Sequence, residues 1–103
     1  MAEHMSYSHL KGEIIMTPEK AFGKVLREIR NEHSLSQEEL GFESGYHRTY
    51  ISLLERGKKS PSLNTVFQLA AALGVRPSEI LRRTEDGVSQ VRRRDGGERR
   101  KTG

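Results

Sequence analysis

One local pattern limits the fold of this chain more than any other: two short helices joined by one glycine-containing turn. The first helix is marked at its start by Ser36, a good N-cap, and by Glu39 three residues later, which together have the spacing of a capping box. Leu35 before the cap and Leu40 after it supply the matching hydrophobic staple. The sequence therefore predicts a helix that begins at Ser36.

Gly45 is well placed to end this helix, because glycine readily takes the left-handed conformation that closes a helix. A second short helix is expected over about residues 47–56, stopping at Gly57. A short helix, a Gly-containing turn and another helix form the helix-turn-helix arrangement. The second helix of such a pair docks in the major groove of DNA.

Three further helices are expected around this pair. Thr17 and Pro18 read as an N-cap followed by a first-turn proline, which starts a helix that runs to about His33. Ser62 caps a fourth helix that ends at Gly74, with a buried face of Leu63, Val66, Phe67, Ala70 and Leu73. Pro77 opens a fifth helix that carries Ile80 and Leu81. No apolar-polar alternation of strand type interrupts the pattern, so the domain is expected to be all-α.

Length and cysteine content exclude several classes of protein. A chain of 103 residues allows one domain, and the absence of Cys rules out a disulfide scaffold and a Cys-based zinc or redox site. No stretch is long and apolar enough for a membrane span, so a cytoplasmic, nucleoid-associated protein is expected. Residues 1–16 are expected to be an N-terminal arm or a leader, with a cloning remnant at its start as an alternative, and residues 17–85 the domain.

The formal charge of +4 is unevenly distributed. Residues 86–103 hold six basic side chains against three acidic ones, which accounts for three of the four net charges. This segment has too few apolar side chains to offset the entropy of ordering it, so a disordered basic tail is expected. Such a tail is commonly just solvated, and the alternative is that it adds nonspecific affinity for the DNA backbone.

The helix over residues 47–56 has two distinct faces. Ile51 and Leu54 fall on one side and are expected in the core. The opposite face holds Arg48, Thr49, Ser52, Leu53 and Arg56. Arginine can bond the O6 and N7 atoms of guanine as a bidentate fork, so this face suits DNA. Such residues on a surface helix are more often merely solvated, but Lys58 and Lys59 follow directly and concentrate positive charge here.

The stretch from Val25 to Leu81 resembles the Xre-type helix-turn-helix family, which includes phage repressors and Cro-like proteins. The resemblance is carried by residues 26–30, 35–40, 44–45, 48–57, 61–63 and 70–81, in the expected order and spacing. The run Arg48-Thr49-Tyr50-Ile51-Ser52 also resembles the recognition helix of controller proteins from restriction–modification systems. The fold implied is a compact five-helix, phage-repressor-like domain.

This resemblance implies a bacterial or phage transcriptional regulator, a repressor or autoregulator, that binds a near-palindromic operator as a homodimer. The implied base-reading residues are His47, Arg48, Thr49 and Leu53. The implied backbone-binding residues are Gln37, Tyr50, Ser52, Arg56, Lys58, Lys59 and Asn64. Dimerisation is implied through Val75, Ile80 and Leu81, and a structural ion pair through Arg30 and Glu55.

Three residues depart from the family pattern. Leu53 replaces a polar residue, so it either reads a thymine methyl group or reads nothing. Gly41 replaces a common alanine, which permits close helix packing, and Phe42 falls at a normally polar position. An exposed Phe42 indicates contact with the arm, a second subunit or another protein.

Two other functional classes compete with the regulator. An antitoxin-type interaction module would use the same fold, bind a toxin partner and still bind its own operator. An enzyme is not expected, because the sequence contains no paired-carboxylate pocket, no Cys nucleophile and no Gly-rich phosphate loop. The four histidines, His4, His9, His33 and His47, lack the spacing of metal ligands, so neither a metal nor a cofactor is expected.

Overall fold

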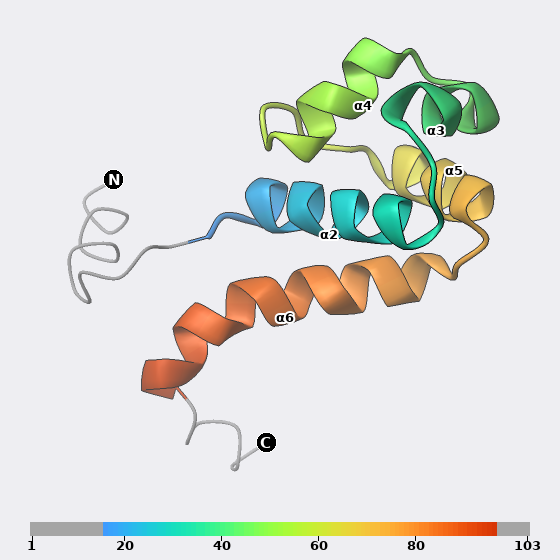
Figure 1. Cartoon of the computed structure of the whole chain (residues 1–103). Helices are drawn as coiled ribbons and strands as arrows, with labels where there is room; N and C mark the ends of the chain where they lie inside the picture. Colours follow the sequence, from blue (N-terminus) through green and yellow to red (C-terminus); the bar gives the residue numbers. More distant parts are fainter. Residues whose placement is uncertain (1–15, 97–103) are drawn as a thin grey trace.

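A computed structural model describes residues 16–96, with side chains described up to Val88. Within that range the chain forms helices and no strands: α2 (Pro18–Glu32), α3 (Gln37–Ser44), α4 (Arg48–Glu55), α5 (Leu63–Leu73) and α6 (Pro77–Gly96). Figure 1 shows α2 lying between α6 on one side and the α3–α4 pair on the other. The expected all-α, five-helix arrangement is therefore confirmed. None of these helices is long and apolar enough to cross a membrane.

The helix boundaries follow the capping signals in the sequence. The hydroxyl of Thr17 accepts a hydrogen bond from the backbone N–H of Lys20 at 3.2 Å. At α3 both halves of the capping box are present, because Ser36 Oγ accepts from the N–H of Glu39 at 2.9 Å and Glu39 Oε1 accepts from the N–H of Ser36 at 2.8 Å. Gly45 closes α3 with a φ of 84°.

The core is formed where all five helices meet. Its largest fully buried side chains are Leu26, Ile29, Leu40, Ile51, Leu54, Leu69 and Ile80. Ile51 and Leu54 are 0% exposed, which confirms the inner face expected for α4. At about 25 cal/mol per Å² of apolar surface, burial of such side chains is the main force that holds the five helices together.

The buried face of α5 differs from the expected one. Leu63 and Phe67 were expected in the core, but they are 68% and 54% exposed, whereas Leu69 and Thr65 are buried. The reason is a set of hydrogen bonds made by the Thr65 hydroxyl, which the spacing of apolar residues does not predict. Thr65 Oγ1 lies 3.0 Å from Ser62 Oγ and accepts from Tyr46 Oη at 3.1 Å, which turns Thr65 inward and the Leu63–Phe67 edge outward.

α6 continues to Gly96, past the domain boundary that was expected after residue 85. The helix therefore overlaps the first residues of the tail that was expected to be disordered from residue 86. Local contacts that composition does not report extend the helix. Arg82 pairs with Asp86 at 3.1 Å, and the buried Thr84 donates its hydroxyl to the Ile80 carbonyl at 2.8 Å. The remainder of the expected tail and the expected arm up to residue 15 lie outside the described residues.

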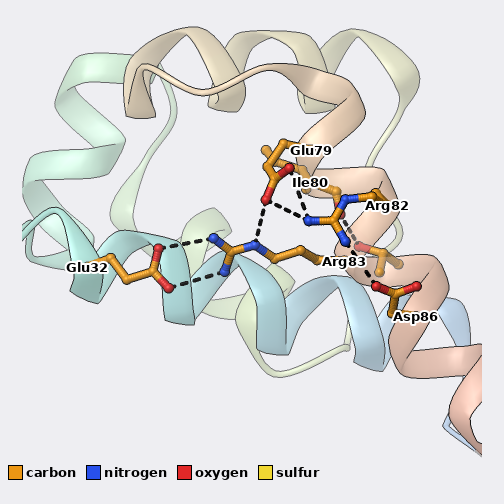
Figure 2. Close-up of polar contacts among 7 residues, drawn as sticks. Glu32, Glu79, Ile80, Arg82, Arg83 and Asp86 are labelled. Carbon is orange, nitrogen blue, oxygen red and sulfur yellow. Dashed lines mark hydrogen bonds and ion pairs between the residues drawn. The ribbon is translucent and has the colours of Figure 1, made fainter.

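An ion-pair network fastens α6 to the C-terminal end of α2 (Figure 2). Arg83 donates to both carboxylate oxygens of Glu32, at 3.1 and 3.2 Å, and its Nε donates to Glu79 at 3.0 Å. Arg82 also donates to both oxygens of Glu79. A bidentate guanidinium–carboxylate pair fixes geometry as well as charge, so Arg83 sets the position of α6 along α2.

Two helical glycines give a matched test of this packing. A Cβ on Gly23 would lie 2.4 Å from the Leu54 carbonyl oxygen, whereas one on Gly87 would lie 3.4 Å from Ala21 Cβ, an ordinary contact. We expect Gly23→Ala to lower the free energy of unfolding by about 1–3 kcal/mol through overpacking. Gly87→Ala should raise it by up to about 1 kcal/mol through helix propensity. Denaturant unfolding followed by circular dichroism measures both, and equal effects would contradict the close α2–α4 contact.

The network in Figure 2 predicts a loss of stability in acid. Hydrogen bonds from Arg83 hold the pKa of Glu32 below its ordinary value, and those from Arg83 and Arg82 do the same for the pKa of Glu79. Because these folded-state pKa values are depressed, their stabilisation is present above the ordinary carboxyl pKa and is lost as pH falls through the folded values. When unfolding is measured at decreasing pH, the free energy of unfolding of the double variant Glu32→Gln, Glu79→Gln should fall less steeply in acid than that of the wild type. An equally steep fall in both proteins would show that Glu32 and Glu79 do not cause the loss of stability in acid.

Candidate nucleic-acid interface

The turn between α3 and α4 is held by close backbone contact. Gly41 is buried, and a Cβ there would lie 2.6 Å from the Tyr46 carbonyl oxygen, so a larger residue would force the turn to move away from α3. The N–H groups of Gly45 and Tyr46 both donate to the Gly41 carbonyl at 2.9 Å. This confirms the expectation that Gly41 permits close packing of the two helices. The turn therefore fixes the direction in which α4 leaves α3.

An aromatic and hydroxyl cluster supports α4 from the side of α5. The rings of Tyr46 and Tyr50 have centroids 5.1 Å apart and are tilted by 46°. The hydroxyl of Tyr50 lies 3.4 Å from Thr65 Oγ1, which Tyr46 also contacts. Tyr50 is half-buried and packs against the core, so it is held mainly by the protein.

The expected base-reading residues gather at the N-terminal end of α4. Arg48 and Thr49 are exposed on its first turn. His47 is the N-cap residue and is exposed, and its side chain makes no capping hydrogen bond. Leu53 lies more than one turn further along and is half-buried. The structure thus brings three polar groups together at one helix end, with Leu53 partly shielded behind them.

The expected backbone-binding residues other than Gln37 lie on α4, in the turn after it and at the start of α5. Arg56, Lys58, Lys59 and Asn64 are exposed, and Ser52 is half-buried and accepts from Arg56 Nε at 3.3 Å. Gln37 differs from these, because its amide nitrogen donates to Glu55 Oε1 at 3.0 Å. Gln37 is therefore part of an internal polar cluster in the structure.

Glu55 is the centre of that cluster. Its side chain is 0% exposed, and Arg30 contacts both carboxylate oxygens, with Nε 2.6 Å from Oε2 and Nη2 2.9 Å from Oε1. Burial alone would raise the pKa of Glu55, but hydrogen bonds from Arg30, Gln37 and Arg27, with the charge of Arg30, outweigh it and hold that pKa below its ordinary value. Glu55 is therefore ionised at neutral pH and joins α2, α3 and α4. The ion pair implied by the family resemblance is confirmed.

The expected dimerisation residues are only partly available at the surface. Ile80 is 0% exposed, because the domain's own core encloses it, so it is removed from that set. Val75 is half-buried against the core, and Leu81 is 42% exposed. Leu81 and the exposed Leu63 line one side of a hollow of about 280 Å³, together with Pro61. Leu63 and Phe67 are further exposed apolar residues that the sequence did not indicate, because their i, i+4 spacing equally fits a buried face.

Phe42 is 85% exposed on α3, as its unusual position in the sequence suggested. Among the described residues, no group of three or more His, Asp or Glu side chains could hold a metal ion.

Comparisons with known proteins agree with this geometry. The helix-turn-helix family model HTH_3 matches residues 26–80. The control protein C.BamHI from Bacillus amyloliquefaciens is 46% identical over 61 residues, which cover 58% of this chain and 75% of that protein. An uncharacterised HTH-type transcriptional regulator from Sinorhizobium fredii is 38% identical over 69% of this chain and 92% of its own length. The crystal structure of the restriction-modification controller protein C.AhdI from Aeromonas hydrophila superposes with a TM-score of 0.58 and 44% identity, covering 59% of this chain and 92% of that one.

The Glu55 cluster gives a test of the scaffold behind α4. We expect Glu55→Ala to lower the free energy of unfolding by about 3–5 kcal/mol, because Arg30, itself largely buried, loses its partner. Glu28→Ala is the control, since it removes only an exposed pair with Lys24 at 3.6 Å and should cost less than about 0.5 kcal/mol. Denaturant unfolding compares the two, and similar losses would contradict the central position of Glu55.

Proposed function

The chain belongs to the HTH_3 helix-turn-helix family, and we propose that it is a sequence-specific transcriptional regulator that binds a near-palindromic operator as a homodimer. The observation that carries the proposal is the exposed end of α4. His47, Arg48 and Thr49 stand there on a helix whose inner face is locked into the core by Ile51 and Leu54. A rigid helix with polar donors at its N-terminal end is suited to reading base edges in the major groove.

In this proposal Arg48 bonds guanine O6 and N7, and His47 and Thr49 contact neighbouring base edges. Leu53, being partly shielded, contributes at most an apolar contact to a thymine methyl group. The exposed cations of the turn after α4, Arg56, Lys58 and Lys59, hold phosphates without reading sequence, together with Ser52, Tyr50 and Asn64. The amide nitrogen of Gln37 gives one N–H to Glu55 and has a second N–H, which in this proposal binds a phosphate and couples DNA binding to that cluster.

The homodimer is supported by apolar groups that a monomer leaves in water. Leu63, Phe67 and Leu81 are all more than 40% exposed, and Leu63 and Leu81 line the same hollow. Large exposed apolar groups that lie together mark interaction surfaces. We propose that Leu81 and the exposed edge of α5, with Val75, form the interface, which would set two α4 helices about one DNA turn apart.

The domain unit is proposed to begin at residue 17 and to include α6 beyond residue 85. Similarity to two controller proteins of restriction–modification systems supports a regulator of that type, acting on its own operon. The outward ring of Phe42 supports a second candidate, an interaction module that binds a protein partner while keeping the DNA-binding face.

Selection of bound sites from random DNA tests the proposal. Enrichment of a near-palindromic motif is expected, since two symmetry-related α4 helices read two half-sites. Failure to enrich any motif would overturn the regulator and favour the interaction module.

Variants of the turn and of α4 separate reading from backbone binding. We expect Arg48→Ala to weaken operator binding by about 1–3 kcal/mol and to relax the preference at one base pair in each half-site. Lys58→Ala should weaken operator and random DNA about equally. Fluorescence anisotropy with both DNAs measures these effects. An equal loss on both DNAs for Arg48→Ala would show that Arg48 does not read a base.

A further inference from the structure

We infer that a basic hollow between α2 and the C-terminal end of α4 binds a phosphate group, and that its natural source is a backbone phosphate of DNA beside the segment read by α4. This inference rests on the proposed function and extends the DNA-binding surface to α2. None of the three α2 cations in the hollow belongs to the DNA-binding residues implied by the sequence. The basic hollow is defined by Met16, Lys20, Lys24, Arg27, Glu55 and Arg56.

The hollow has the size and chemistry of an oxyanion site. Its volume is about 220 Å³, which leaves room for a phosphate group and water. Four of its six lining side chains are cationic, three from α2 and one from Arg56, the C-cap residue of α4. Lysine and arginine around a concave surface favour a tetrahedral oxyanion, because several charge-assisted hydrogen bonds converge on one group.

The one carboxylate in the hollow does not neutralise these cations. Glu55 already accepts two hydrogen bonds from Arg30 and one from Gln37. Arg27 reaches it only through Nε at 3.4 Å, and the Arg27 side chain is 53% exposed. Arg27 therefore contributes little to holding Glu55, and its charge remains available to a ligand.

The other cations are equally poorly paired. Lys24 lies 3.6 Å from Glu28, but both side chains are about half exposed or more, so this pair is worth little. Among the side chains that the structure describes, neither Lys20 nor Arg56 forms an ion pair. Grouping like charges without counter-charges costs free energy in the free protein, and an anion would relieve that cost.

The hollow is continuous with the proposed DNA-binding surface. Arg56 belongs to both, since it closes α4 and lines the hollow. The turn that follows lies directly over the first turn of α2, because a Cβ on Gly57 would be 2.8 Å from Lys20 Cγ. Lys58 and Lys59 extend from that turn. A DNA strand held by these lysines therefore has its next cationic partners on α2, and Figure 1 shows this end of α2 beside the turn.

The salt dependence of operator binding tests the inference. The double variant Lys20→Gln, Lys24→Gln removes two exposed charges and leaves the Glu55 cluster intact. Its plot of log K against log salt concentration should be shallower than that of the full-length wild-type chain by about 1 for each phosphate that the variant no longer binds. Its preference for operator over random DNA should not change, because binding a phosphate carries no sequence information. The double variant Lys20→Arg, Lys24→Arg is the control and should retain the wild-type slope.

Each outcome separates the inference from the proposed function. Absence of any selected motif for the wild-type chain would overturn the proposed function. Normal operator binding with the same slope for the Gln variant, the Arg variant and the wild type would overturn the DNA-phosphate site alone. Inorganic phosphate, titrated against the DNA-free chain and followed by NMR, separates the two phosphate sources. Saturable shifts at Lys20 and Lys24 with an unchanged DNA slope would assign the site to free phosphate and overturn its assignment to DNA.

Discussion

The buried carboxylate of Glu55 is the contact on which the arrangement of the first three described helices depends. It is held by Arg30 from α2 and Gln37 from α3, while its own backbone belongs to α4. An ionised group without solvent is costly unless it is fully paired, so any movement of one helix away from the others leaves charge unsatisfied. α4 therefore gains its fixed orientation from a polar contact at its C-terminal end, away from the residues proposed to meet the bases.

Two glycines, at positions where a side chain would not fit, add a second constraint on the position of α4. Gly23 lets α2 approach the last carbonyls of α4, and Gly41 lets α3 approach the start of α4. α4 is thus held near both ends by backbone contacts that are too close to accommodate a side chain at Gly23 or Gly41. Close backbone packing and a saturated carboxylate together make α4 a rigid element, which suits a surface that has to match a groove.

Local signals in the sequence predicted much of this fold, and the errors lie where distant contacts decide. The capping box of Ser36 and Glu39 and the left-handed Gly45 were readable because their causes lie within a few residues. The outward turn of Leu63 and Phe67 was not, because it depends on a hydrogen bond between Thr65 and Tyr46, which lies in the distant turn before α4. Ile80 was assigned to a dimer surface because its enclosure by the core depends on tertiary packing. The extension of α6 beyond residue 85 is a different case, because its supporting pair Arg82–Asp86 has a local i, i+4 spacing that a count of charged residues in the tail does not register.

The hydroxyl cluster of Tyr46, Tyr50, Ser62 and Thr65 has a mechanical consequence for a dimer. It links the turn before α4 directly to the capped start of α5, the helix whose outer edge carries Leu63 and Phe67. If that edge is the contact between two copies, these hydrogen bonds form a direct link between the dimer interface and the start of α4. A dimer joined there would therefore place its two α4 helices through a few hydroxyl contacts rather than through a long chain of packed side chains.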